Sequence, residues 1–475
     1  MLNDILYALP ISAISFVCIT TIVLSAILRG KNTIVFVYAV GGLALTIGTV
    51  VLTFRANTTA FGGMVATGTY PGFFDLLFCS AGILVMLAGR TYFQRFAFEF
   101  DELYIMILLA TSGMMLMAHA NHLLIVFIGI EVMSISFYVL ASYMRHHVLS
   151  VEAGLKYFLL GAFATGFLLY GMALIYGATG GQLEFGAIRV AVGTSASPLL
   201  LLAGTGLVIV GLSFKVAAFP FHLWAPDVYQ GAPTVVTAFM STAGKAAAFS
   251  AFIPMMNALI PDGAPEARKI YLLLAGISAA SMLFGNIVAA SQTNVKRMLA
   301  YSSVAQAGYM LMGIVAGSKA GVGGMMTYLA AYMFTQIGAL VVASMLETEY
   351  GKQLEFEDYA GLSKSHPALA ALMALFMFSL VGIPPLAMFF GKYYLFMAAV
   401  EAGFMWLAVV AALATVISAY FYLGLIVTMY FRSRTREQAE AEANVGLSGV
   451  TLLLSVVGVV TLGVLPALLL KLTGM

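Results

Sequence analysis

The sequence has very few charged residues. Asp, Glu, Lys and Arg make up only 9% of its 475 residues, against about 25% in an average soluble protein. Hydrophobic residues make up 62%, and the mean hydropathy is +1.01. This composition excludes a soluble globular domain. The apolar runs are long and continuous, unlike the alternating strands of a membrane β-barrel, so we predict an all-α polytopic membrane protein.

Cysteine and histidine are also scarce, which limits the chemistry of the chain. Cys18 and Cys79 lie in separate apolar runs and form no CxxC motif, so iron–sulfur, haem-attachment and thiolate-zinc sites are not expected. The six histidines show no HxxxH or HExxH spacing. The net charge of +2, without a basic-aromatic patch, predicts no nucleic-acid partner. We therefore expect no metal, no cofactor and no stand-alone active site in this chain.

Fourteen apolar runs are long enough to cross a hydrocarbon core of about 30 Å. The first is too long for the core of a signal peptide, and we expect it to be retained. The spans are predicted at residues 6–28, 33–54, 73–90, 102–119, 121–143, 153–177, 198–219, 233–257, 269–290, 294–317, 320–345, 366–398, 404–430 and 447–470.

The distribution of basic residues between the connecting loops predicts the orientation. One set of loops holds twelve of them: Arg29, Lys31, Arg90, Arg95, Arg145, Lys296, Arg297, Lys352, Lys364, Arg432, Arg434 and Arg436. The opposite set holds six: Arg55, Arg189, Arg268, Lys269, Lys319 and Lys471. The richer side is expected to be cytoplasmic, which places both termini in the periplasm. The run Arg432–Glu437 is then a topology anchor, and the acidic stretch Glu347–His366 is expected to be a solvated connector.

Proline-rich breaks interrupt two of the spans. The seventh breaks at Ala217–Pro233, which contains three prolines, and the twelfth breaks at Val381–Ala387, which contains two adjacent prolines. Proline removes a backbone donor and opens the helix, and open backbone at membrane depth is tolerated where it is buried in protein or lines a wet cavity.

Because the two breaks are five spans apart, they predict an internal repeat. The predicted units are residues 102–257 and 269–430, preceded by three helices in residues 1–101 and followed by one at 447–470. An odd number of spans inverts the second copy, and inverted repeats with broken helices are typical of transporters.

Five charged residues fall inside the predicted spans: Glu131, Lys156, Lys215, Lys245 and Lys392. Each charge at the bilayer centre costs about 2.5–3.5 kcal/mol, so five cost about 12–17 kcal/mol. That is as large as the stability of a whole domain, which indicates a function. Burial moves the pKa of a lysine toward the physiological range, whereas arginine stays charged, so the pattern favours proton transfer.

Further polar residues accompany these charges. His222 and Tyr229 lie in the first break, where they either extend a hydrogen-bonded path or cap the broken helix, and Asp227 is expected to cap helix amides. Lys156 is near the start of its span, where its side chain can instead extend to the membrane surface. We therefore treat Lys156, His222 and Tyr229 as secondary site candidates.

Three segments resemble a known family. Gly129–Tyr143 contains the intramembrane acid, Phe214–Phe249 contains the first break with two lysines, and Asn294–Tyr309 has the sequence NVKRMLAYSSVAQAGY. In order and spacing they resemble the antiporter-like membrane subunits shared by respiratory complex I and Mrp-type cation/proton antiporters. Lys392 stands where the M-type branch has a glutamate, and no long lateral helix of the L-type branch follows, so the chain resembles the bacterial N-type branch.

This resemblance implies a fold and a set of partners. It implies about fourteen transmembrane helices with two inverted five-helix repeats, each containing a broken helix, in the bacterial inner membrane. FMN, iron–sulfur clusters and quinone are expected in partner subunits and not in this chain. The expected neighbours are an M-type subunit, small K- and J-type subunits and the lipid bilayer.

The resulting hypothesis is a buried proton relay. Glu131 and Lys215 receive a proton from the cytoplasm, with help from Lys156, and Lys245 passes it along the membrane midplane to Lys392 on the periplasmic side. Quinone reduction elsewhere in the complex drives the relay. Two alternatives remain: a subunit of an Mrp-type Na+/H+ antiporter, and a structural membrane subunit that conducts no protons.

Overall fold

The computed structural model describes residues 2–28, 30–96, 98, 100–193, 197–260, 265–350, 354–433 and 445–467. Within these ranges the chain is almost entirely α-helical, with a single two-stranded hairpin. Several residues used to predict the orientation lie outside the described ranges: Arg29, Lys352, Arg434, Arg436, Glu437 and Lys471.

The chain divides into two compact units, each made of segments that contact one another. Unit 1 contains Met1–Ile83, Phe100–Ala217 and Ala243–Leu274, and unit 2 contains Leu84–Glu99, Ala218–Thr242 and Ala275–Met475. Helices α4 (Thr69–Arg95) and α13 (Pro265–Ala289) contribute residues to both units. The predicted inverted repeats stay a prediction.

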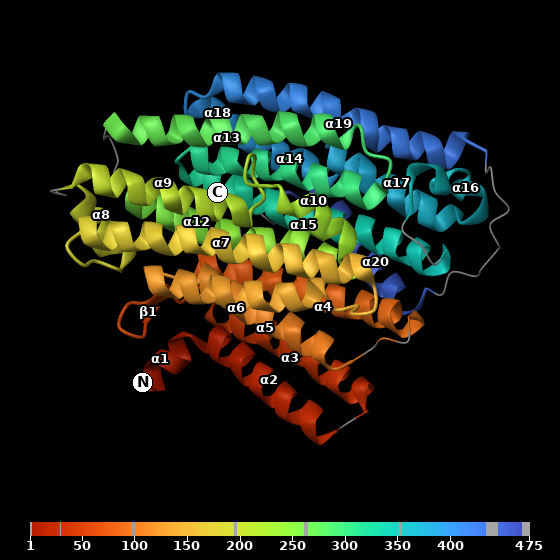
Figure 1. Cartoon of the computed structure of the whole chain (residues 1–475), viewed down its shortest axis with the longest axis horizontal. Helices are drawn as coiled ribbons and strands as arrows, with labels where there is room; N and C mark the ends of the chain where they lie inside the picture. The colour runs from red at the N-terminus through yellow and green to blue at the C-terminus, as the bar shows by residue number, and fades with distance from the viewer. Residues whose placement is uncertain are drawn as a thin grey trace. The chain divides into compact units, whose positions relative to one another are not determined.

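Unit 1 is built mainly from the N-terminal half of the chain. Its helices are α1 (Leu2–Tyr7), α2 (Leu9–Ile27), α3 (Asn32–Thr53), α5 (Glu102–Ala118), α6 (Leu123–Ala141), α7 (Val148–Ala178), α8 (Phe185–Val192), α9 (Pro198–Lys215) and α12 (Lys245–Leu259). The antiparallel strands β1 (Thr59–Ala60) and β2 (Val65–Ala66) connect α3 to α4. Helices α7 and α9 lie side by side, as do α5 and α6 (Figure 1).

Unit 2 is built mainly from the C-terminal half. Its helices are α10 (Trp224–Gly231), α11 (Thr234–Phe239), α14 (Val295–Val315), α15 (Lys319–Tyr350), α16 (Leu362–Ser365), α17 (Pro367–Val381), α18 (Ala387–Glu401), α19 (Met405–Phe431) and α20 (Gly446–Val464), with the 3-10 turn η2 (Phe356–Tyr359). Helices α14 and α15 are almost fully buried and pack against each other. They form the centre of this unit.

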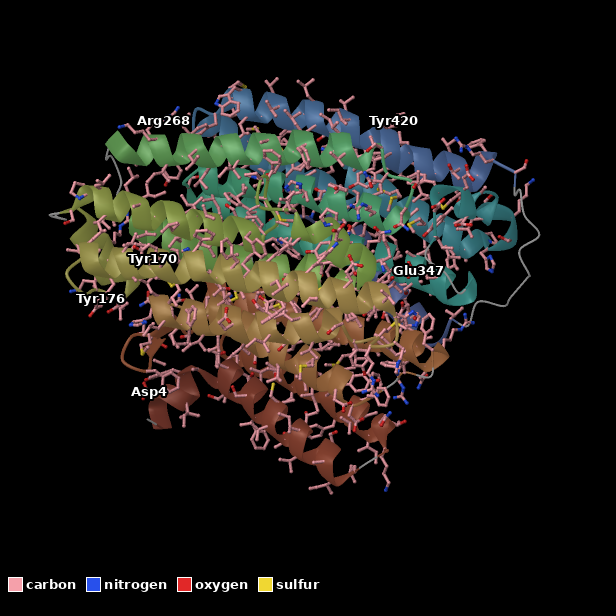
Figure 2. All side chains as sticks on the ribbon, viewed as in Figure 1. Asp4, Tyr170, Tyr176, Arg268, Glu347 and Tyr420 are labelled. Atoms are coloured by element: carbon pink, nitrogen blue, oxygen red, sulfur yellow. The ribbon has the colours of Figure 1, made fainter. Side chains whose placement is uncertain are left out.

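The structure confirms a multi-pass membrane protein. Among the described residues, twelve helices are long and apolar enough to cross a membrane. The two remaining predicted spans correspond to α5, which is 17 residues long, and to the broken pair α17 and α18. Helix α7 exposes many large apolar side chains, and Tyr170 and Tyr176 point outward from it (Figure 2). Such an apolar exterior suits lipid or another membrane protein.

Both predicted helix breaks are present. Helix α9 ends at Lys215 and the next helix begins at Trp224, while α17 ends at Val381 and α18 begins at Ala387. Gly382 has a φ of +92°, a left-handed conformation that glycine adopts readily. The sequence did not predict a π-helical turn, η1 (Met240–Gly244), directly before α12. Such turns occur frequently at functional sites.

One sequence prediction is wrong at the end of α15. The predicted span stops at residue 345, and Glu347 was assigned to a solvated connector. The helix instead continues to Tyr350, and Glu347 is 6% exposed. Lys296, which was counted among the loop residues, is the second residue of α14 and is 3% exposed. Both assignments failed because a charged residue in the first or last turns of a helix can turn inward toward a partner.

Candidate functional site

The first predicted pair, Glu131 and Lys215, is brought together within unit 1. Lys215 is the last residue of α9 and is 4% exposed. Its Nζ donates a hydrogen bond of 2.7 Å to Ser134 Oγ on α6. Glu131 lies one turn before Ser134 on the same face of α6, and its carboxylate interacts electrostatically with Lys215. Lys215 is therefore bonded to α6 at a serine one turn from Glu131.

The serine was not identified from the sequence. Ser134 is fully buried, and its hydroxyl donates in turn to the carbonyl of Ile130 at 2.5 Å. Glu131 Oε1 is also buried, and among the described residues no group forms a hydrogen bond with it. The three-residue spacing between Glu131 and Ser134 was the available signal, because residues at i and i+3 share a helix face.

Lys245 begins α12 directly after the π-helical turn and is 1% exposed. Gly244 precedes it, and a Cβ atom at that position would lie 2.6 Å from the ring of Phe137 on α6. Helix α12 therefore approaches α6 more closely than any larger residue at position 244 would allow. It also contacts α9, the helix that carries Lys215.

Lys392 lies in unit 2 and closes the second helix break. Its Nζ donates to the carbonyls of Leu380 at 3.1 Å and Val381 at 2.8 Å, the last residues of α17. It also lies 5.0 Å from the centre of the Tyr309 ring. A cation suits a helix C-terminus, where the carbonyls have no helical partner. The broken helix thus supplies the polar surroundings that a buried lysine needs.

Lys156 lies on an exposed face of α7 in unit 1. Its side chain is 41% exposed and forms an ion pair of 2.8 Å with Glu152, one turn earlier. Its role in the relay stays a prediction, as does the alternative that its side chain extends to the membrane surface.

The residues of the first break are held by their neighbours in unit 2. His222 is 2% exposed and stacks on Phe219, with 5.5 Å between ring centres. Tyr229 is 1% exposed and packs against Trp224. Asp227 forms an ion pair of 2.8 Å with Arg297.

A further polar contact lies in unit 1, outside the predicted site. His119 is 2% exposed and bonds through Nε2 to Asp75 at 2.7 Å and through Nδ1 to the Ala66 carbonyl at 2.7 Å. His122 caps α6 by accepting a bond from the Leu124 amide. Burial lowers the pKa of His122, and the nearby Glu184 carboxylate acts in the opposite direction.

Among the described residues, no group of three or more His, Cys, Asp or Glu side chains is placed to hold a metal ion. Among the buried charges, Lys296 and Glu347 form a pair, and Lys392 bonds to backbone carbonyls. This arrangement suits the binding and release of protons.

Comparison with known proteins identifies the family. The family described as "NADH:quinone oxidoreductase/Mrp antiporter, TM" matches residues 120–418. NADH-quinone oxidoreductase subunit N of Salinibacter ruber is 42% identical over 417 residues, covering 86% of this chain and 82% of the relative. Subunit N 1 of Chloroherpeton thalassium is 40% identical over 478 residues, covering 100% and 98%.

Solved structures agree with the sequence comparison. A chain of respiratory complex I from Thermus thermophilus, solved with bound aureothin, has a TM-score of 0.80 and 34% identity, covering 97% of this chain and 98% of that one. A chain of the Mrp complex from Dietzia has a TM-score of 0.86 at 21% identity, covering 100% and 96%, which shows a shared fold. The chain therefore belongs to the NADH-quinone oxidoreductase subunit N family, within the wider group of antiporter-like membrane subunits.

Proposed function

We propose that this chain is a proton-translocating membrane subunit of a bacterial NADH:quinone oxidoreductase. It carries protons from the cytoplasm to the periplasm through Glu131, Lys215, Lys245 and Lys392, and both of its termini face the periplasm. The observation that carries the proposal is the buried contact of Lys215 with Ser134 beside the Glu131 carboxylate. A lysine in this setting costs free energy that packing alone does not recover.

The family supports the choice of complex. Its members are named as subunits of NADH-quinone oxidoreductase, so the expected neighbours are the M-type, K-type and J-type membrane subunits. FMN, iron–sulfur clusters and quinone belong to partner subunits in this proposal. The translocase function of this chain consists of proton movement without redox chemistry of its own.

The switch is a change in the contact between Glu131 and Lys215. In the structure Lys215 bonds to Ser134, and a direct ion pair with Glu131 is the alternative state. At about 4 Å and an effective dielectric constant near 20, such a pair is worth about 4 kcal/mol. Moving one charge through 100 mV costs about 2.3 kcal/mol. One closure of the pair is therefore sufficient to work against a membrane potential above 100 mV.

Lys392 has a corresponding role at the second break. Its ammonium is held by two carbonyls of α17, which stabilise the charged form. A shift of α18 relative to α17 lengthens these bonds and favours release of the proton. Lys245, at the π-helical turn, is the intermediate carrier, and Lys156, His222 and Tyr229 are secondary members of the path.

The direct test is Lys215→Ala in the assembled complex, reconstituted into liposomes. We expect the complex to assemble and proton pumping per NADH to be lost, because the first carrier is missing. Ser136→Ala is a matched control, since Ser136 lies two residues from Ser134 and its hydroxyl donates to the carbonyl of Val132. Wild-type pumping in Lys215→Ala would show that this lysine carries no protons.

An Mrp-type antiporter subunit is the second candidate, favoured by the shared fold with the Dietzia Mrp complex. Purification of the chain in mild detergent, followed by an assay of NADH:quinone reductase activity, separates the two. Redox activity in the purified assembly supports the first proposal. Sodium-dependent proton exchange without redox activity supports the second. A subunit that conducts no protons predicts normal pumping in all the relay variants.

A further inference from the structure

A second buried acid–base pair lies in unit 2, apart from the relay proposed above. Lys296 Nζ is 4.0 Å from Glu347 Oε1, and the two side chains are only 4% and 7% exposed. Glu347 Oε2 accepts a hydrogen bond from the Thr234 hydroxyl, and Lys296 donates to the Ala232 carbonyl at 2.8 Å. Tyr92 also interacts electrostatically with Glu347. Figure 2 labels Glu347, which lies near the end of α15.

Polar side chains continue from this pair along the seam between α14 and α15. The Tyr328 hydroxyl donates to Gln306 Oε1, and Ser303 on α14 and Tyr332 on α15 are both fully buried. Gln336 lies one turn from Tyr332 on the side toward Glu347 and is 1% exposed. Its Oε1 is buried, with no hydrogen-bond partner among the described residues.

The seam extends along α14 to Tyr309, whose ring faces Lys392. Gln306 Nε2 donates to the Tyr422 hydroxyl at 3.2 Å, and Tyr422 bonds to the Ser302 hydroxyl. One turn beyond Gln306 on α14, the Tyr309 ring faces Lys392 at 5.0 Å. The rise of 1.5 Å per residue places Tyr309 about 20 Å from Lys296 along the helix axis. That distance is about two-thirds of a hydrocarbon core of about 30 Å.

Helix packing alone does not explain this seam. Hydrogen bonds between membrane helices are worth about 0.6 kcal/mol on average, whereas each buried ion costs several kcal/mol. If the seam served only to join two helices, its buried carbonyl oxygens would all be hydrogen-bonded. The side-chain oxygen of Gln336 has no such bond among the described residues. That oxygen gives a water molecule a binding position between Glu347 and Tyr332 along α15.

We propose that Glu347 and Lys296 form a second proton-loading site, which delivers protons along the α14–α15 seam to Lys392. This inference rests on the proposed function of the chain. Each transfer breaks one O–H or N–H bond and forms another on the next oxygen or nitrogen, so no electron moves and no other reactant is consumed. Unit 2 thus takes up protons without receiving all of them from Lys215. Loss of a general acid–base group slows the proton transfer that it serves by about 10²–10⁴-fold.

The test compares Glu347→Gln with Glu347→Asp in the assembled complex in liposomes. Glutamine still accepts the Thr234 bond but carries no proton, so pumping per NADH should fall, and aspartate should restore it in part. Asp227→Asn is the matched control, because it alters the neighbouring, partly exposed Arg297–Asp227 bridge and should pump normally. Wild-type pumping in Glu347→Gln, or an equal loss in Asp227→Asn, would overturn the proposal.

Tyr328→Phe provides an independent variant if Glu347→Gln fails to assemble. It removes one hydroxyl in the middle of the seam and preserves the ring, so pumping should fall with assembly intact; normal pumping contradicts the proposal. The Lys215→Ala variant distinguishes failure of the second loading site from failure of the proposed function. Lost pumping there, with normal pumping in Glu347→Gln and Tyr328→Phe, rejects only the second loading site. Normal pumping in Lys215→Ala rejects the proposed function.

Discussion

The two buried acid–base pairs are held in different ways. In unit 1 the Glu131 carboxylate has one oxygen without a hydrogen bond among the described residues, and Lys215 bonds instead to Ser134. In unit 2 Glu347 is bonded to Thr234, and Lys296 to a backbone carbonyl. A partly satisfied pair can rearrange more readily than one whose members are both hydrogen-bonded. We infer that the first pair switches between two arrangements, whereas the second pair takes up and releases protons in a single arrangement.

The largest difference between the pairs is expected in stability. Lys296→Ala leaves Glu347 buried without its cation, and breaking a buried pair in this way costs about 3–5 kcal/mol. The thermal unfolding of the purified complex should show this loss, and the double variant Lys296→Met with Glu347→Leu should recover part of it. An unfolding temperature unchanged by Lys296→Ala would mean that the second pair is no more constrained than the first.

A smaller effect is expected from the serine that joins the first pair. Ser134→Ala removes the acceptor of the Lys215 ammonium, which costs about 1–3 kcal/mol when the donor is buried. Because Lys215 is then free to bond Glu131 directly, we also expect slower proton release and lower turnover. NADH-driven pumping should be measured in Ser134→Ala and in Ser136→Ala under the same conditions. Equal effects of the two substitutions would show that the hydroxyl of Ser134 has no special role.

The smallest effect is expected at His122, which lies outside both pairs. His122→Ala removes the cap of α6 and should cost about 0.5–2 kcal/mol, whereas His122→Asn should preserve it. Because burial lowers the pKa of His122 in the folded protein, the unfolded chain binds its proton more readily. The stability contribution is therefore complete above the usual histidine pKa near 6.5 and is lost as the pH falls below it.

The measurement is the difference in unfolding temperature between the wild-type protein and His122→Asn from pH 8 to pH 5. The wild-type protein should become less stable relative to His122→Asn as the pH falls. A difference independent of pH would show that His122 does not titrate in this range. Any pH dependence that remains in the asparagine variant then belongs to other groups, including the two pairs.

The sequence predicted the fold and part of the candidate site. Hydropathy located the spans, because each apolar run is a local property of the chain. Proline located both breaks, and the three family segments contained Glu131, Lys215 and Lys245. It left the role of Lys156 open, and the structure places this residue on an exposed face of its helix.

Tertiary structure decided the rest. Lys296 and Glu347 are 51 residues apart in the sequence and had been assigned to solvated segments, yet both turn inward where α14 and α15 pack together. The polar seam is also invisible in a single helix, because Gln306 and Tyr328 are unremarkable until they share a hydrogen bond. The sequence by itself therefore determined which segments enter the membrane and which charges they carry. Only the packing of helices decided which charges are buried together, because partners for a buried charge come from other helices.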